Sequence, residues 1–212
     1  MHPSAQVLTD PDSGPARIGP NALIQTRAAV TALHGPSSWE RVRRASHLPT
    51  SLPGEMVDER HFRRLVEAMV ELFGMPAAHR MLGAAGARTA DYVRRNRIPS
   101  LARGVLRLLP DRWSRPLLLR AIQRHAWTFV GSGRMKHRRD RISIDGCLTC
   151  TGFTSEHPTG AFYQAAFESL LTHLVDPRLR VEETRCVARG DDACVFRIRR
   201  GDDPPYPTTS QA

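Results

Sequence analysis

The spacing of apolar residues changes near His125, and this change limits the folds that the chain can adopt. Before His125, apolar side chains recur at steps of three and four residues, as they do on one face of an α-helix. After it, short segments rich in Val, Ile, Phe and Thr are typical of β-strands, and one helical segment interrupts them. The sequence therefore predicts an α+β fold, with a helical N-terminal part followed by an antiparallel sheet with one long packed helix.

The helical part is predicted to contain six helices whose ends coincide with proline and glycine. The clearest covers residues 58–73, where apolar residues at helical spacing form a continuous face. The first begins at Pro20 and ends at Gly35, because proline suits the opening turn of a helix and glycine favours its end. The others are expected over residues 39–45, 77–96, 101–109 and 111–125.

The second part is predicted to contain strands over residues 127–130, 141–144, 180–188 and 194–198, and a helix over residues 159–174. The sequence Gly190-Asp191-Asp192 has the composition of a turn and separates the last two strands, which therefore form an antiparallel hairpin. A dense basic run from Arg134 to Arg141 is expected to be a solvated loop between strands.

Both ends of the chain are rich in polar residues, proline and glycine and lack an apolar period. Residues 1–17 are therefore expected to form a flexible arm and residues 201–212 a flexible tail. Between them lie the helical part, residues 18–125, and the strand-rich part, residues 126–200. No apolar run approaches the ~20 residues that span a bilayer, and the first residues do not resemble a secretory signal. We expect a cytoplasmic protein without a membrane span.

The formal charge of +10 is compatible with several anionic partners. Lys136 is the only lysine, so the excess is almost entirely arginine, and a bias of this kind follows codon composition as readily as function. Zinc-finger spacing, an RNP-type aromatic motif and a heptad zipper are all missing from the sequence. Nucleic acid is therefore not expected as a partner.

A glycine pair, Gly83 and Gly86, is the nearest approach to a dinucleotide-binding motif. It lies inside a helical pattern and no strand precedes it, as such a motif requires. Close packing of two helices at small residues is the favoured interpretation.

Four cysteines lie in the second part of the chain. Cys147 and Cys150 form a C-x-x-C, while Cys186 and Cys194 flank the predicted hairpin turn. In a reducing compartment structural disulfides are rare. Thiolates at these spacings can chelate zinc, and buried thiols without a ligand are the alternative that stays open.

The segment from Glu183 to Phe196 carries a resemblance to a known family. It has an acidic residue, a cysteine three positions later, a Gly-Asp turn and a second cysteine eight positions beyond the first. With the preceding helix from Gly160, it resembles the terminal signature of the 4-vinyl reductase domain family, over roughly residues 125–200. The N-terminal half, opening IGPNALIQTRAAV, is similar to bacteriochlorophyll biosynthesis proteins of that family.

This resemblance implies a 4-vinyl-reductase-type ligand-binding domain, of a kind that is often dimeric. It implies binding of a divinyl chlorophyllide or protochlorophyllide, and reduction of a vinyl group by a reductant such as reduced nicotinamide. The alternative is a non-catalytic carrier that delivers the tetrapyrrole to another pathway enzyme. A ligand sensor is a third hypothesis, but no DNA-binding or ATPase segment accompanies the domain. A protein of this pathway would work in the cytoplasm or at the periphery of the photosynthetic membrane.

A chlorophyllide-type ligand implies an axial ligand for magnesium, a flat apolar pocket and a cation for its propionates. The candidates for the axial ligand are His125, His157 and His173, although any single histidine is more often a surface or structural residue. The pocket and the cation are assigned to Trp127, Phe129, Phe162, Tyr163 and Arg139. Ordinary core packing would account for the aromatic residues equally well.

The resemblance also bears on the metal. In aromatic-sensing regulators similar to this domain, zinc is held by residues corresponding to Glu183, Cys186 and Cys194, together with an earlier cysteine. That earlier position is Gly160 here. Cys147 or Cys150 would have to take its place, with Glu183 competing for the last position.

Overall fold

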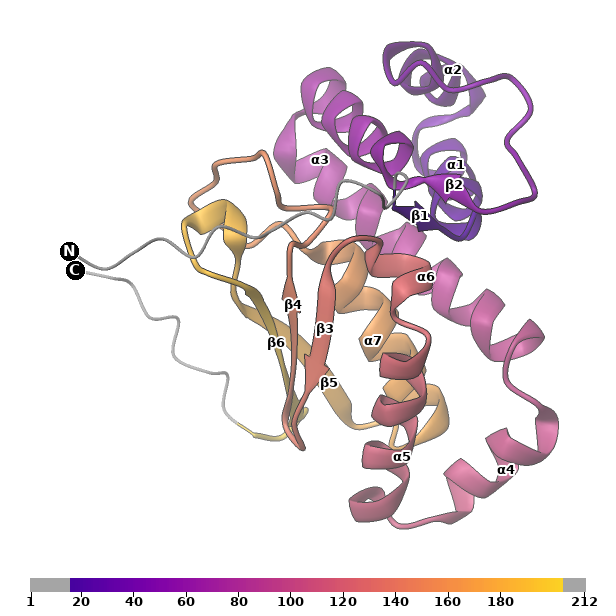
Figure 1. Cartoon of the computed structure of the whole chain (residues 1–212), viewed down its shortest axis with the longest axis vertical. Coiled ribbons are helices and arrows are strands. Elements are labelled where there is room, and N and C mark those ends of the chain that lie inside the picture. The colour runs from indigo at the N-terminus through magenta and orange to yellow at the C-terminus, as the bar shows by residue number, and fades with distance from the viewer. Residues whose placement is uncertain (1–15, 204–212) are drawn as a thin grey trace.

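The computed structural model describes residues 16–203 (Figure 1). Most of the predicted arm and tail, residues 1–15 and 204–212, lies outside the described residues, while Arg17 belongs to a short strand. The helices are α1 (Asn21–His34), α2 (Pro36–Ala45), α3 (Glu59–Asn96), α4 (Ser100–Leu108), α5 (Asp111–Arg124), α6 (Trp127–Val130) and α7 (Ala161–Leu174). The strands are β1 (Arg17–Ile18), β2 (Val57–Asp58), β3 (Arg134–His137), β4 (Arg141–Asp145), β5 (Leu179–Arg185) and β6 (Cys194–Arg200), with a 3-10 turn, η1 (Val187–Arg189).

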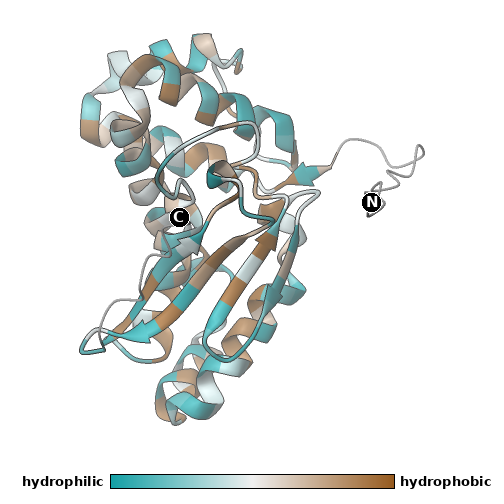
Figure 2. Ribbon diagram, turned by 90° about the vertical axis from the view of Figure 1, so that its left-hand side faces the viewer, coloured by the Kyte–Doolittle hydropathy of each residue, from teal (hydrophilic) through white to brown (hydrophobic). Residues whose placement is uncertain are grey.

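The predicted α+β fold is confirmed. Four antiparallel strands form one sheet in the order β3-β4-β6-β5, and β1 pairs with β2 beside the N-terminal helices. The predicted hairpin is β5 and β6, with Glu183 opposite Phe196 and an irregularity between Glu183 and Arg185. Figure 2 shows hydrophobic and hydrophilic residues alternating along the strands, as expected for a sheet with one covered face.

Helix α7 packs against the sheet, and α3 packs against α7 on the side away from it (Figure 1). The long helix α3 is interrupted at Gly74, which has a φ of 75°, and Pro76 follows. The prediction of two helices, 58–73 and 77–96, is therefore correct in substance. Within residues 16–203, no helix is both long enough and apolar enough to cross a membrane.

Two elements differ from the sequence prediction. Residues 127–130 were expected to be a strand and form α6, whose Phe129 and Val130 amides donate to the Ala126 carbonyl. Their aromatic and β-branched composition favours a strand, but the segment lacks a partner strand and the chain turns directly after α5. The expected basic loop contains β3 instead, because Met135 is buried and faces Ile144 across the edge of the sheet.

Helices α3 and α7 approach each other closely at Gly86. A β-carbon at this position would lie 2.0 Å from the Phe162 carbonyl oxygen, so only glycine lets the two backbones meet. Phe62 packs edge-on against Phe162 nearby, with ring centroids 5.1 Å apart. The interpretation of the glycine pair as a packing feature is confirmed at Gly86.

A buried carboxylate joins the start of α3 to the turn before β3. Glu59 is 8% exposed, and its carboxylate accepts hydrogen bonds from the Ser132 amide (2.7 Å) and hydroxyl (2.8 Å). Gly131, with a φ of 58°, lies so close that a β-carbon would be 2.0 Å from a Glu59 oxygen. The N-terminal helices and the sheet are therefore tied together by polar contacts as well as by a shared core.

We expect Gly86→Ala to destabilise the protein by about 1–3 kcal/mol, because a methyl group would collide with backbone that has no flexible end to move. Thermal unfolding measures the change. Gly104→Ala in α4 is the matched control, since nothing lies within 4 Å of that position, and it should stabilise by roughly 0.5–1 kcal/mol. Equal effects of the two substitutions would contradict the close approach.

Candidate metal centre

The β5–β6 hairpin places three candidate ligands at one end of the sheet. Glu183 lies near the end of β5, Cys186 follows the strand, and Cys194 begins β6. All three are buried, with exposed fractions of 4% or less. The turn between them is held by Asp191, whose carboxylate accepts a hydrogen bond from the Cys186 amide (2.8 Å).

The loop after β4 brings the other two cysteines to the same place. The amides of Cys150 and Thr151 donate to the Cys147 carbonyl, which closes a tight turn of the kind that C-x-x-C metal sites use. The sulfurs of Cys147 and Cys150 lie 3.2 Å apart and both are fully buried. The structure therefore brings together all five metal-ligating residues that the sequence suggested.

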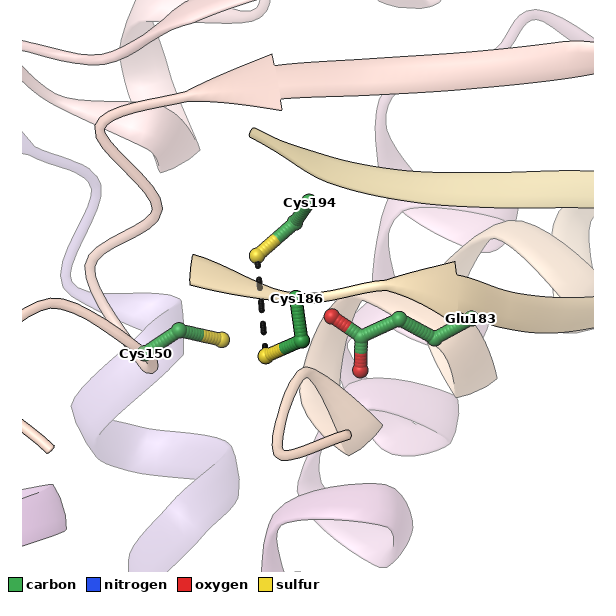
Figure 3. A group of neighbouring side chains, drawn as sticks. All are labelled: Cys150, Glu183, Cys186 and Cys194. Carbon is green, nitrogen blue, oxygen red and sulfur yellow. Dashed lines mark hydrogen bonds between the residues drawn. The ribbon is translucent and has the colours of Figure 1, made fainter. Parts of the chain in front are cut away.

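Four of the five have the geometry of a single ion site. One ligand atom from each of Cys150, Glu183, Cys186 and Cys194 lies within 4.8 Å of all the others (Figure 3). The sulfurs of Cys186 and Cys194 are 3.9 Å apart. Thiolates at the ~2.3 Å bond length of tetrahedral zinc would be separated by roughly 3.8 Å, so the arrangement fits a metal ion with little movement.

Backbone amides surround the centre and face its ligand atoms. The amide of Thr159 lies 3.4 Å from the Cys186 sulfur, and that of Val187 lies 3.5 Å from the Cys194 sulfur. Hydrogen bonds of this type favour the anionic forms that bind metals. Sequence reasoning missed Thr159 and Asp191 because they support the ligands through backbone groups, which leave no spacing signal.

Gly160 explains why the fourth candidate ligand comes from the C-x-x-C loop. Its amide donates to the Glu183 carboxylate (2.6 Å), and a β-carbon at this position would lie 2.6 Å from the other carboxylate oxygen. A side chain at position 160 would thus collide with Glu183. The space of the earlier cysteine is filled by the glutamate, and Cys150 approaches from the opposite side.

The centre holds its protons tightly when no cation is bound. Burial, reinforced by the Cys186 thiol, raises the pKa of Glu183 to about 9. Hydrogen bonds from the neighbouring thiols hold the pKa of Cys194 far above its usual range. Although burial opposes it, hydrogen bonds from Cys150, Cys194 and Thr149 lower the pKa of Cys147 to about 5. A divalent cation would have to displace protons from the other groups.

Four of the eight residues predicted to bind a tetrapyrrole lie close together. His125 ends α5 and is exposed, and Trp127 beside it is 59% exposed. Phe129 is half-buried, and its ring lies 6.4 Å from that of Tyr163, whose hydroxyl donates to the Phe129 carbonyl (3.0 Å). We refer to His125, Trp127 and Phe129 as the α5–α6 corner.

The other predicted residues lie elsewhere. Phe162 faces α3 in the core, and Arg139 is exposed in the turn between β3 and β4. His157 precedes α7 and His173 lies in its last turn, about 20 Å apart at the helical rise per residue. Two open surface hollows, of about 460 and 500 Å³, lie along α1, and none of the eight residues lines either of them.

Comparison with known proteins agrees with these features. Residues 140–200 match the 4-vinyl reductase domain, and this segment includes every candidate metal ligand. The chain is 36% identical to the bacteriochlorophyll synthase 23 kDa chain of Cereibacter sphaeroides, over 87% of this chain and 93% of that one. The corresponding protein of Rhodobacter capsulatus is 35% identical, over 88% of both chains.

Among solved structures, an H-NOX protein from S. oneidensis in the Fe(II)NO ligation state has a similar fold. The TM-score is 0.52 at 12% identity, covering 86% of this chain and 99% of that one. The fold and the cysteine-rich hairpin thus define a protein with a 4-vinyl reductase domain and an α+β fold. More particularly, the chain belongs to the family of the bacteriochlorophyll synthase 23 kDa chain.

We expect Cys150→Ser to reduce zinc affinity by more than the roughly 10- to 100-fold typical of residues that only support ligands. Cys147→Ser is the matched control, because Cys147 lies outside the set of four mutually close ligands. Metal content of purified protein and competition with a chromogenic chelator give both values. Loss of metal in the Cys147 variant alone would assign the fourth position to Cys147.

Zinc affinity should rise with pH up to about 9, because below that value the Glu183 carboxyl must lose a proton to bind the ion. Chelator competition at several pH values measures the slope. In Glu183→Gln the slope should be shallower by about one proton per ion. An affinity that does not change with pH would show that the ligands are already deprotonated.

Proposed function

We propose that the protein binds a chlorophyllide-type tetrapyrrole intermediate of bacteriochlorophyll biosynthesis. The observation that carries this proposal is the identity of 36% across 87% of the chain with a bacteriochlorophyll synthase chain. The match covers the helical part as well as the 4-vinyl reductase segment, so it relates the whole architecture to this pathway. The tetrapyrrole itself is our inference from that relationship.

The α5–α6 corner is our proposed binding position. His125 and Trp127 are exposed side by side, and Phe129 continues the aromatic surface toward the core through Tyr163. A neutral imidazole suits the fifth position of magnesium, and an exposed indole offers a flat apolar face for a macrocycle. Arg124, also exposed and adjacent, would pair with a propionate.

Two activities could follow from binding. Vinyl reduction needs a hydride donor such as reduced nicotinamide, and delivery to another pathway enzyme needs none. A specific observation favours delivery: the one glycine-rich segment resembling a nucleotide motif is occupied in helix packing, with Gly86 against the Phe162 backbone. The carrier is therefore our second candidate beside the reductase, and the experiment below separates them.

We further propose that the metal centre holds zinc in a structural role. Three thiolates and one carboxylate are a donor set that suits zinc. All four ligands are buried, which is typical of a closed structural site rather than a catalytic one with an open position. The ion would fasten the C-x-x-C loop to the hairpin and to the start of α7.

Purified protein should shift the absorption spectrum of divinyl protochlorophyllide at a stoichiometry of one pigment per chain. His125→Ala and Trp127→Ala should each weaken binding by roughly tenfold or more, as expected when a main contact is lost. His157→Ala and His173→Ala are matched controls, because both histidines are exposed but lie away from the corner. A spectral shift that survives in the His125 variant and disappears in a control would move the site.

The same incubation with added reduced nicotinamide distinguishes the two activities. Monovinyl product in excess of protein would establish the reductase. A stoichiometric complex whose vinyl group is unchanged would support the carrier. No spectral shift in the wild type would refute the tetrapyrrole proposal itself.

A further inference from the structure

The hairpin formed by α4 and α5 exposes an unusual amount of apolar surface. Of eight large hydrophobic side chains that are exposed among residues 16–203, five belong to these two helices. Leu101 is 79% exposed, Leu108 is 87% exposed and Trp113 is 62% exposed; Val105 and Leu117 complete the set. We call these five residues the hairpin patch. Neighbouring exposed apolar residues of this kind commonly mark a contact surface.

The exposed residues follow helical spacing, so each helix turns one apolar stripe outward. Leu101, Val105 and Leu108 lie at steps of four and three residues on α4. Trp113 and Leu117 lie four residues apart on α5, and Arg120 and Arg124 continue the same stripe. An aromatic and aliphatic surface thus passes directly into a cationic one.

The hairpin is weakly anchored to the rest of the molecule. The two helices lie side by side along one edge, away from α1 and α2 (Figure 1). Leu106 is the only residue of α4 that is buried, and Arg107 adds a hydrogen bond to the His173 carbonyl (3.0 Å). A helix of nine residues is marginal by itself in water, so further burial against a partner would stabilise it.

The charge of the hairpin is strongly positive. Residues 100–124 contain six arginines and one acidic residue, Asp111, which leaves a net charge of +5. Asp111 is itself paired with Arg115 and Arg200. In the described part of the chain, Arg112, Arg120 and Arg124 form no ion pair with a carboxylate. These three side chains are directed to solvent and are open to an anionic surface.

We propose that the α4–α5 hairpin binds the surface of a membrane that contains anionic lipids. Leucine and tryptophan enter the interfacial region of a bilayer, and flanking arginines extend toward headgroup phosphates. A second copy of the chain is a poorer fit, because a symmetric interface would bring two net charges of +5 together. The inference does not depend on pigment binding.

The test is sedimentation of the metal-loaded, pigment-free protein with vesicles. We expect binding to vesicles of phosphatidylglycerol and phosphatidylcholine, and much weaker binding to phosphatidylcholine alone. Each arginine near an anionic surface contributes about 1 kcal/mol, so Arg120→Gln should weaken binding about fivefold. Arg44→Gln, at an exposed position on α2, is the matched control and should leave binding nearly unchanged.

The apolar contribution is tested in the same way. Leu108→Gln should reduce the bound fraction, whereas Leu33→Gln, a 52% exposed leucine on α1, should not. Both leucines are on the surface, so thermal unfolding should confirm that each variant folds. Equal binding of the two variants, or no binding of the wild type to anionic vesicles, would overturn the proposal.

Sedimentation velocity in the absence of lipid provides an independent outcome. A dimer that dissociates in Leu108→Gln would assign the patch to a second copy and overturn the membrane proposal. A pigment experiment that fails while vesicles are still bound would leave this inference standing and reject only the proposed ligand.

Discussion

The close approach of α3 and α7 at Gly86 is the contact on which the rest of the structure depends. It fixes α7 against the N-terminal helices, and α7 in turn covers the sheet. Because the backbones meet directly, the position of α7 along α3 is set by main-chain shape rather than by adaptable side chains. The start of α7 carries Gly160, so the same contact determines where the metal centre finds its backbone amide.

The two functional regions lie at different points along α7 and use different physics. At its start, the centre combines buried thiols and a carboxylate, which makes sense only if a cation compensates their charge. Further along, Tyr163 and Phe167 pack against Phe129 of the α5–α6 corner. Helix α7 thereby connects a polar, closed site with an aromatic surface that is open to solvent.

The sequence predicted the helices and the hairpin well because their signals are local. Apolar spacing and the Gly190 turn depend on near neighbours, and the cysteines at the hairpin could be placed from position alone. The helical form of residues 127–130 could not be predicted, since it depends on the chain turning after α5. Likewise, β3 owes its pairing to β4, and its single buried residue, Met135, gives almost no alternating pattern. The sites were predictable to different degrees for a related reason. Metal ligands must converge on one point, so a hairpin and a tight C-x-x-C turn nearly determine the set, whereas residues that bind a large flat molecule can be spread over many elements. His157 and His173 bracket α7 in the sequence, yet the helix between them holds them far apart.

The segment that matches the 4-vinyl reductase domain, residues 140–200, supplies only part of a core that it shares with α3. Cut out alone, it would present the ring of Phe162 and the inner face of α7 to water, and its sheet would lose the edge strand β3. The recurring unit of this family is therefore a signature rather than a transplantable module. Grafting it onto another protein would require carrying along a helix that begins far upstream, at Glu59.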